Sequence, residues 1–150
     1  MQLLRAYPLH FLKDNLNVSK LTIYTDGAAR GNPGPAAIGC VIKDDKGTIV
    51  ATISRCLGAT TNNQAEYRAI IAALEKAASI GAKQIALFSD SELVVKQING
   101  QYKVKHAALR PLYLEVVKLA GALESFKISN VPRERNKEAD ALANKALDNQ

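Results

Sequence analysis

Four acidic side chains stand at positions where chemistry is a better explanation than an ordinary surface charge. Asp26 follows the alternating apolar stretch LTIYT, and Asp90 follows directly after the apolar stretch QIALFS. Glu66 and Asp140 lie in alanine-rich stretches of helical period, TNNQAEYRAIIAAL and EADALA. Taken singly, Asp26 is explained as a turn residue, Asp90 as a helix N-cap and the other two as solvated helix positions.

Taken together, the four acids predict a metal site. The carboxyl ends of parallel strands meet at one edge of an open sheet, so Asp26 and Asp90 are predicted to lie close together. Clustered carboxylates repel each other and require a cation. Oxygen ligands without cysteine or histidine suit Mg²⁺ or Mn²⁺ better than zinc. Two such ions about 4 Å apart promote in-line displacement at a phosphodiester, which is the chemistry that this pattern favours.

The elements that must position these acids follow the order β-β-β-α-β-α-α-β-α. The loop Asp44-Asp45-Lys46-Gly47 joins two β-branched runs and predicts a hairpin. This order indicates an α/β fold with a five-stranded mixed sheet, a three-stranded antiparallel meander plus two parallel strands, flanked by helices. The predicted strands are 21–25, 36–43, 48–57, 84–89 and 125–131, and the predicted helices are 62–80, 91–99, 107–123 and 136–147.

The composition bounds the class of protein. The chain has 150 residues, of which 47% are hydrophobic, and we predict a folded domain over 21–150 after an N-terminal extension over 1–20. Its net charge of +6 favours a polyanionic partner. No apolar window is long enough for a membrane span, and Arg5, Pro8 and His10 interrupt the apolar N-terminus, which argues against a targeting signal. Two cysteines without metal-ligand spacing predict a reducing, cytoplasmic location, and nothing in the sequence indicates an oligomer, so a monomer is expected.

Four stretches, YTDGAARGNPGPAAIG, TTNNQAEYRAI, SDSELVVKQ and NKEADALAN, resemble in order and spacing the motifs of type 1 ribonuclease H. The resemblance covers about Leu21–Leu147 and implies the ribonuclease H-like fold. It implies endonucleolytic hydrolysis of the RNA strand of RNA–DNA hybrids by two-metal catalysis, which leaves 5′-phosphate and 3′-hydroxyl ends. The catalytic and metal-binding carboxylates that it implies are Asp26, Glu66, Asp90 and Asp140, with Mg²⁺ as the cofactor and Mn²⁺ as a possible substitute.

The same resemblance implies a set of substrate contacts. Selectivity for a hybrid requires groups that sense the 2′-hydroxyl, and asparagine offers both donors and acceptors. The positions that match minor-groove contacts are the backbone of Ala29 and the side chains of Asn32, Asn62 and Asn63, and Thr61 matches a contact to DNA phosphate. Capping of a helix by Asn62 and Asn63 is the structural alternative, and we expect both roles together. Tyr102 fits either packing or contact with the DNA strand.

Two departures from the family pattern have consequences. Many type 1 enzymes carry a long basic handle with tryptophans, whereas this chain has the short connection NGQYKVKH and no tryptophan. Lys96, Lys103, Lys105 and Arg110 are predicted to supply part of the missing charge, with weaker and more salt-sensitive binding. The loop before the last helix, NVPRERNKEAD, also lacks the histidine of many relatives. Arg133 or Glu134 is a candidate replacement, and a plain solvated connection is the alternative.

Other functions remain open at this point. The same fold and acid cluster occur in nucleases that act on DNA, and an additional activity on double-stranded RNA is compatible with the motifs. A non-catalytic hybrid-binding module is a further alternative, but a pure binder of phosphates gains nothing from four clustered carboxylates. The sequence therefore favours the hybrid-directed nuclease.

Overall fold

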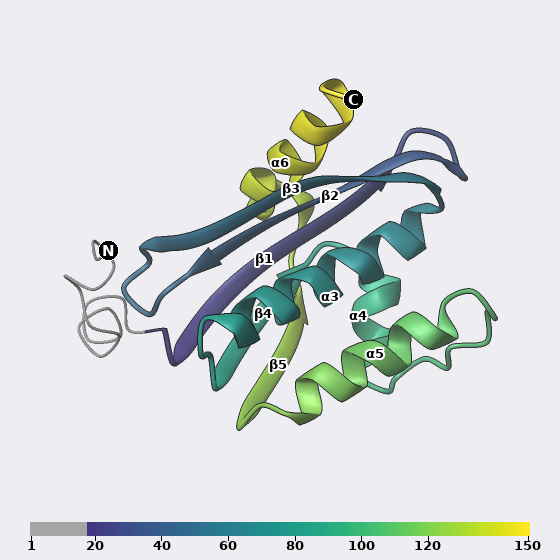
Figure 1. Ribbon diagram of the computed structural model, residues 1–150. Coiled ribbons are helices and arrows are strands. Elements are labelled where there is room, and N and C mark those ends of the chain that lie inside the picture. The colour runs from purple at the N-terminus through teal and green to yellow at the C-terminus, as the bar shows by residue number, and fades with distance from the viewer. Residues whose placement is uncertain (1–17) are drawn as a thin grey trace.

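The computed structural model describes residues 18–150, which contain a five-stranded mixed sheet (Figure 1). The strand order is β3-β2-β1-β4-β5. β1, β2 and β3 pair antiparallel, and β1–β4 and β4–β5 pair parallel, which confirms the predicted meander plus two parallel strands. The strands are β1 (Lys20–Ala29), β2 (Gly34–Lys43), β3 (Ile49–Thr60), β4 (Gln84–Ser89) and β5 (Ser125–Asn130).

Helices cover both faces of this sheet. In Figure 1, α6 lies on one face, and α3, α4 and α5 lie on the other. No helix within residues 18–150 is long and apolar enough to cross a membrane. The bounds are α3 (Asn62–Ser79), α4 (Glu92–Ile98), α5 (Arg110–Gly121) and α6 (Lys137–Asp148), and a single 3₁₀ turn, η1 (Arg133–Arg135), precedes α6.

The main core lies between the sheet and α3. Fully buried side chains of the central strands, such as Ile23 and Leu87, pack with Ile70 of α3 in one apolar cluster. Each such side chain contributes about 1.5–3 kcal/mol to folding. The buried Tyr67 satisfies its hydroxyl by donating to Oε1 of Gln97 at 2.7 Å. The helix α3 is therefore packed against β1, which carries Asp26, and against β4, which Asp90 follows.

Two glycines allow the helices to approach the sheet at backbone distance. A Cβ on Gly27 would lie 2.2 Å from the backbone carbon of Ala65 in α3. A Cβ on Gly39 would lie 2.1 Å from the backbone oxygen of Ala139 in α6. Gly39 pairs with Asp26, the residue next to Gly27, and successive residues of a strand face opposite sides of the sheet. The two close approaches therefore meet the sheet from opposite faces at the same point.

The structure corrects one prediction about Asp26. Asp26 does not end its strand, because β1 continues to Ala29 while paired with β2. The parallel ladder with β4, however, ends at Thr25 and Ser89, so Asp26 is the first residue beyond that ladder. The carboxyl-end argument therefore holds for the β1–β4 pair and not for the strand itself.

The start of α5 and the start of the folded unit also differ from the predictions. α5 begins at Arg110 rather than at 107, because Pro111 has no N–H to donate to a preceding turn and so belongs in the first turn. Val18 is buried in the core and Lys20 pairs with Gln84, so the folded unit includes the last residues of the predicted extension. The remainder of that extension, 1–17, lies outside the described residues. The hairpin at Asp44 is confirmed, with its carboxylate accepting the N–H groups of Lys46 and Thr48.

Candidate active site

Three of the four predicted carboxylates meet at the end of the β1–β4 ladder. One oxygen each from Asp26 of β1, Glu66 of α3 and Asp90 just after β4 lie within 4.8 Å of one another. Asp26 and Glu66 are buried, and Asp90 is half-buried. Residues that are far apart in the chain thus form one acidic centre, as the strand-end argument predicts.

Glu66 owes its orientation to Gly27. The N–H of Gly27 donates to Oε1 of Glu66 at 3.0 Å, which ties the first turns of α3 to β1. Any side chain at Gly27 would collide with the backbone of Ala65 and Glu66. The carboxylate therefore projects from a helix that touches the strand directly.

Asp90 is held by Asn136, a residue that the sequence reasoning missed. Asn136 is buried, and its Nδ2 donates to the carbonyl of Thr25 at 2.8 Å and to Oδ2 of Asp90 at 3.1 Å. The alternative role of Asp90 as a helix N-cap is wrong, because Ser91 caps α4 through its Oγ and the N–H of Val94. A polar residue just before an acid-bearing helix was the only sequence signal for Asn136.

Asp140 approaches from the opposite face of the sheet. It lies in the first turn of α6, it lies close enough to Asp26 to raise the pKa of that carboxyl, and it faces Arg133 at 3.8 Å. Its oxygens are not part of the triad within 4.8 Å. The structure therefore brings all four acids to one place, with one oxygen from each of three acids within 4.8 Å of the others and Asp140 beside Asp26.

The electrostatics of this centre favour a bound cation. Burial, followed by the charges of Asp90 and Asp140, raises the pKa of Asp26 from 3.8 to about 8. Burial and the charge of Asp26 also raise the pKa of Glu66 well above its ordinary value, although the Gly27 N–H opposes this shift. A cluster of oxygen ligands without nitrogen or sulfur fits a hard divalent cation.

The carboxylates line a groove of about 440 Å³ that also contains predicted substrate residues. The Ala29 N–H donates to Oδ1 of Asn62 at 2.9 Å, and the Asn62 N–H donates to Oδ1 of Asn32 at 3.0 Å. The N-cap of α3 is Thr61, whose Oγ1 accepts from Gln64, so the alternative that Asn62 and Asn63 cap the helix is wrong. Other residues that line the groove are Gly27, Ala28, Arg30, Arg133, Asn144 and Leu147.

Known proteins are similar to this chain in sequence and in fold. A family model described as reverse transcriptase-like matches residues 24–146. A ribonuclease HI of Halobacterium salinarum is 49% identical over 125 residues, which are 83% of this chain and 63% of that protein. The crystal structure of RNase H1 from the same organism matches with a TM-score of 0.85 and 46% identity, and the match covers 87% of this chain and 99% of that one. The chain belongs to the ribonuclease H family.

Two other relatives are similar to most of this chain. LC11-RNase H1, crystallised with an RNA/DNA hybrid, is 42% identical with a TM-score of 0.82, covering 86% of this chain and 97% of that one. A bifunctional protein of Mycobacterium tuberculosis is 45% identical over 130 residues, which are 86% of this chain. This chain spans only 36% of the length of that protein and 63% of the Halobacterium ribonuclease HI.

In this ribonuclease H chain, the loop before α6 lacks the histidine of many relatives. Its two candidate replacements, Arg133 and Glu134, lie in different places. Arg133 lines the groove of the four acids. Glu134 lines a different hollow, together with Tyr24, Lys43 and other residues around the start of α6. The structure therefore brings Arg133 to the acidic centre and does not bring Glu134 there.

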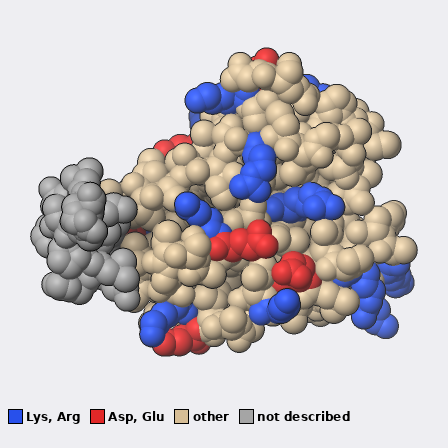
Figure 2. Space-filling view, in the orientation of Figure 1, with Lys and Arg blue, Asp and Glu red and all other residues tan. Residues whose placement is uncertain are grey.

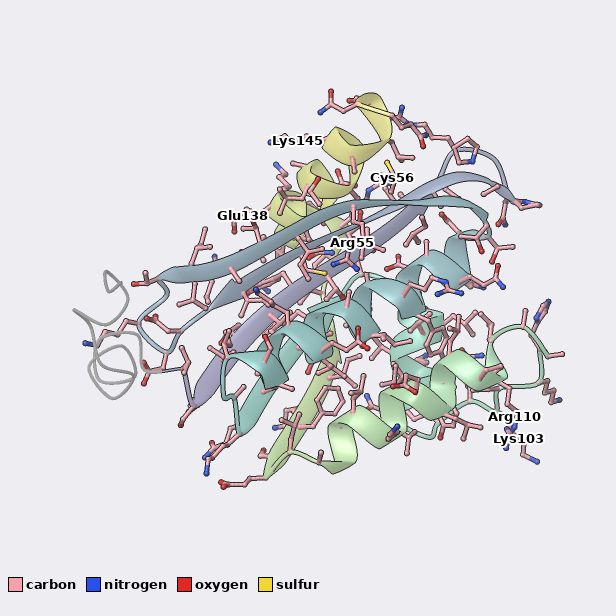
Figure 3. All side chains as sticks on the ribbon, viewed as in Figure 1. Arg55, Cys56, Lys103, Arg110, Glu138 and Lys145 are labelled. Atoms are coloured by element: carbon pink, nitrogen blue, oxygen red, sulfur yellow. The ribbon has the colours of Figure 1, made fainter. Side chains whose placement is uncertain are left out.

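The short connection before α5 forms a basic surface. Lys103, Lys105 and Arg110 line a hollow of about 400 Å³ with Tyr102 and Tyr113. Figure 2 shows basic side chains gathered at the lower right, where Figure 3 labels Lys103 and Arg110. Lys96, the fourth predicted basic residue, instead pairs with Glu92 at 3.1 Å and lies over the ring of Tyr102.

Proposed function

We propose that this ribonuclease H family member is an endoribonuclease that hydrolyses the RNA strand of RNA–DNA hybrids and leaves 5′-phosphate and 3′-hydroxyl ends. The observation that carries the proposal is the triad of carboxylate oxygens within 4.8 Å, with Asp140 beside it, in an open groove. The hybrid-bound relative LC11-RNase H1 supports the substrate class. The proposal includes action as a monomer, in the cytoplasm, by the folded domain that contains residues 18–150.

The four carboxylates Asp26, Glu66, Asp90 and Asp140 would hold Mg²⁺, with Mn²⁺ as a substitute. When bound there, two ions would supply a nucleophilic water at neutral pH and would stabilise the charge on the leaving oxygen. Asn136 keeps Asp90 in place and the Gly27 N–H keeps Glu66 in place, so the ligands are oriented before substrate arrives.

Recognition of the RNA strand is assigned to an asparagine network at the groove, in which Asn62 lines the groove and Asn32 is joined to the backbone of Asn62. The Oδ1 atoms of Asn32 and Asn62 are used internally, and among residues 18–150 their Nδ2 groups have no partner. These donors, the half-buried Asn63 and the backbone of Ala29 are suited to hydroxyl groups in a minor groove. Thr61 is proposed as a phosphate contact on the DNA strand.

The test compares labelled hybrid, duplex DNA and double-stranded RNA in Mg²⁺, Mn²⁺ and chelator. Cleavage of the RNA strand of the hybrid with either metal, and none in chelator, is expected. Asp26→Asn should lose the activity, and Glu75→Gln, which removes an exposed acid from α3, should keep it. The end groups are read by ligation of the 5′-phosphate fragment. Binding of hybrid without cleavage would instead establish a binding module, and cleavage of the DNA strand a DNA-directed nuclease.

A further inference from the structure

Arg30 joins the β1–β2 loop to the C-terminal end of α6 beside the groove, which Arg30 and Asn144 line. Its Nη2 lies 2.6 Å from Oδ1 of Asp148 and 3.4 Å from Oδ1 of Asn144. Asn144 in turn donates from Nδ2 to the carbonyl of Asp140 at 3.1 Å, one turn earlier in the same helix. The guanidinium is therefore anchored to the helix that carries an acid of the active centre.

The backbone of the loop fixes the position of Arg30. The Arg30 N–H donates to the carbonyl of Pro35 at 2.8 Å. A Cβ on Gly34 would lie 2.2 Å from the carbonyl oxygen of Arg30, and Gly31 has a φ of 103°, which favours glycine. The backbone of Arg30 is therefore fixed by its hydrogen bond to Pro35, in a loop that requires glycine at positions 31 and 34.

The ion pair with Asp148 contributes little to stability. The side chain of Arg30 is 50% exposed and that of Asp148 is 63% exposed, and exposed pairs of this kind are weakened by solvent. Both contacts use the same nitrogen, so Nη1 and Nε have no partner among residues 18–150. These two groups can donate to the oxygens of a phosphate while Nη2 stays on Asp148.

The groove requires such a cation. Its four carboxylates repel the phosphates of a nucleic acid. Among the described residues that line the groove, Arg30 and Arg133 are the only cations. Arg133 already faces Asp140, and its side chain is 82% exposed. Arg30 is the cation that the loop and α6 hold in place on the wall formed by Ala29 and Asn62.

We propose that Arg30 binds a backbone phosphate of the strand that is cleaved, within a few nucleotides of the cut, and that Asp148 positions its guanidinium. The inference rests on the proposed function, because it names a contact of the same groove. It concerns the cleaved strand because Arg30 lines the groove that holds the carboxylates.

The first experiment measures the salt dependence of hybrid binding in the non-cleaving Asp26→Asn background. Arg30→Gln should weaken binding roughly tenfold and lower the slope of log K against log salt by about one unit. Arg30→Lys should keep the slope and recover part of the affinity, because it keeps the charge and loses the additional donors. Lys145→Gln, which removes an exposed charge from α6 outside the groove (Figure 3), should preserve the slope.

The second experiment locates the contact. Single neutral methylphosphonates are placed along each strand of the hybrid, and binding is measured for the Asp26→Asn protein with and without Arg30→Gln. At one position on the RNA strand, the methylphosphonate should weaken binding by the Asp26→Asn protein and should not affect binding by its Arg30→Gln variant. This non-additivity is expected when Arg30 contacts the phosphate at that position. Asp148→Asn should reduce the affinity with the slope unchanged and the coupling at that position diminished.

The outcomes separate this inference from the proposed function. If the hybrid is cleaved but the Arg30→Gln slope equals that of its parent, or coupling occurs only on the DNA strand, the assignment of Arg30 is wrong and the function stands. If the wild-type protein binds hybrid and cleaves none, the proposed function fails, and with it the statement that Arg30 holds a cleaved strand. Coupling between Arg30 and one RNA phosphate in a protein that cleaves hybrid supports both.

Discussion

Asp26 and Gly39 face each other across the β1–β2 ladder, and the space that a side chain at Gly39 would occupy is filled by the backbone of α6. A Cβ there would lie 2.1 Å from the Ala139 oxygen and 2.5 Å from the Ala143 nitrogen. The position of Asp140 relative to Asp26 therefore depends on the absence of one methyl group.

Gly39→Ala should displace α6 and impair both stability and catalysis. Overpacking of this kind costs about 1–3 kcal/mol, which denaturant unfolding would measure, and kcat should fall because Asp140 moves with its helix. Gly121→Ala is the matched control, since a Cβ at Gly121 meets nothing within 4 Å in α5. If Gly39→Ala has the same free energy of unfolding and the same kcat as the wild type, the packing of α6 at Gly39 does not determine the position of Asp140.

Asp26→Asn should stabilise the metal-free protein in a pH-dependent manner. Asp26 has a pKa of about 8 in the fold against 3.8 ordinarily, so the folded state binds more protons between these values. The stability of the wild type therefore falls as pH rises through this window, and asparagine escapes the fall. In chelator, the gain in Tm should be small near pH 4 and largest above pH 8. A gain that shrinks with rising pH would contradict the assigned cause.

Substitutions at Asn62 and Asn63 should differ in their effects on thermal stability and on the preference for hybrid over duplex DNA. Asn63→Ala should lower the preference for hybrid over duplex DNA by about 1 kcal/mol without changing Tm, because its side chain has no partner among residues 18–150. Asn62→Ala should lower both, since Asn62 also accepts the Ala29 N–H. Competition binding in the Asp26→Asn background gives the preference. An unchanged preference in Asn63→Ala would leave that residue without a recognition role.

Arg133 and Glu134 should differ in the step that they affect. Arg133 lines the groove, so Arg133→Gln should lower the salt slope of binding by about one unit. Glu134 lines another hollow, so Glu134→Ala should leave single and multiple turnover unchanged. Slower multiple turnover alone in Glu134→Ala would instead assign that residue to product release.

The basic surface formed by Lys103, Lys105 and Arg110 should contribute to the affinity for hybrid and not to the rate of cleavage. Replacing Lys103, Lys105 and Arg110 together by glutamine should weaken hybrid binding and lower the salt slope by about two or three units. The rate at saturating hybrid should persist, because these residues lie outside the groove. Lys96→Gln should have a smaller effect, since Lys96 is paired with Glu92. A slope that is the same for the triple variant and the wild type would exclude the loop from binding.

How much of this was available from the sequence depends on the range of the interactions. Strands and helices were predicted well where local period decides them, as at α3 and β4. The extension of β1 to Ala29 was not, because Gly27 and its small neighbours have weak strand preference and are held by pairing with β2. The Arg30–Asp148 contact spans 118 positions, and no local pattern encodes it.

The candidate site shows the same division. The four acids were predicted to cluster because they interrupt apolar stretches, and the strand-end rule predicted that Asp26 lies near Asp90, which the structure shows. Asn136 was missed, since its contacts to Thr25 and Asp90 exist only after α6 packs on the sheet. Glu134 was proposed with Arg133 because neighbours in the chain look equivalent, whereas the turn η1 sends them to different hollows.

The sandwiching of the sheet by α3 and α6 has a consequence for how the protein unfolds. Glu66 and Asp140 belong to helices on opposite faces, so the acidic centre is complete only while both layers are docked. Metal ions held by these four carboxylates would link the two helical layers and would make partial opening of either helix less favourable. Hydrogen exchange should then slow in α3 and α6 together when Mg²⁺ is added, although the two helices lie on opposite sides of the sheet.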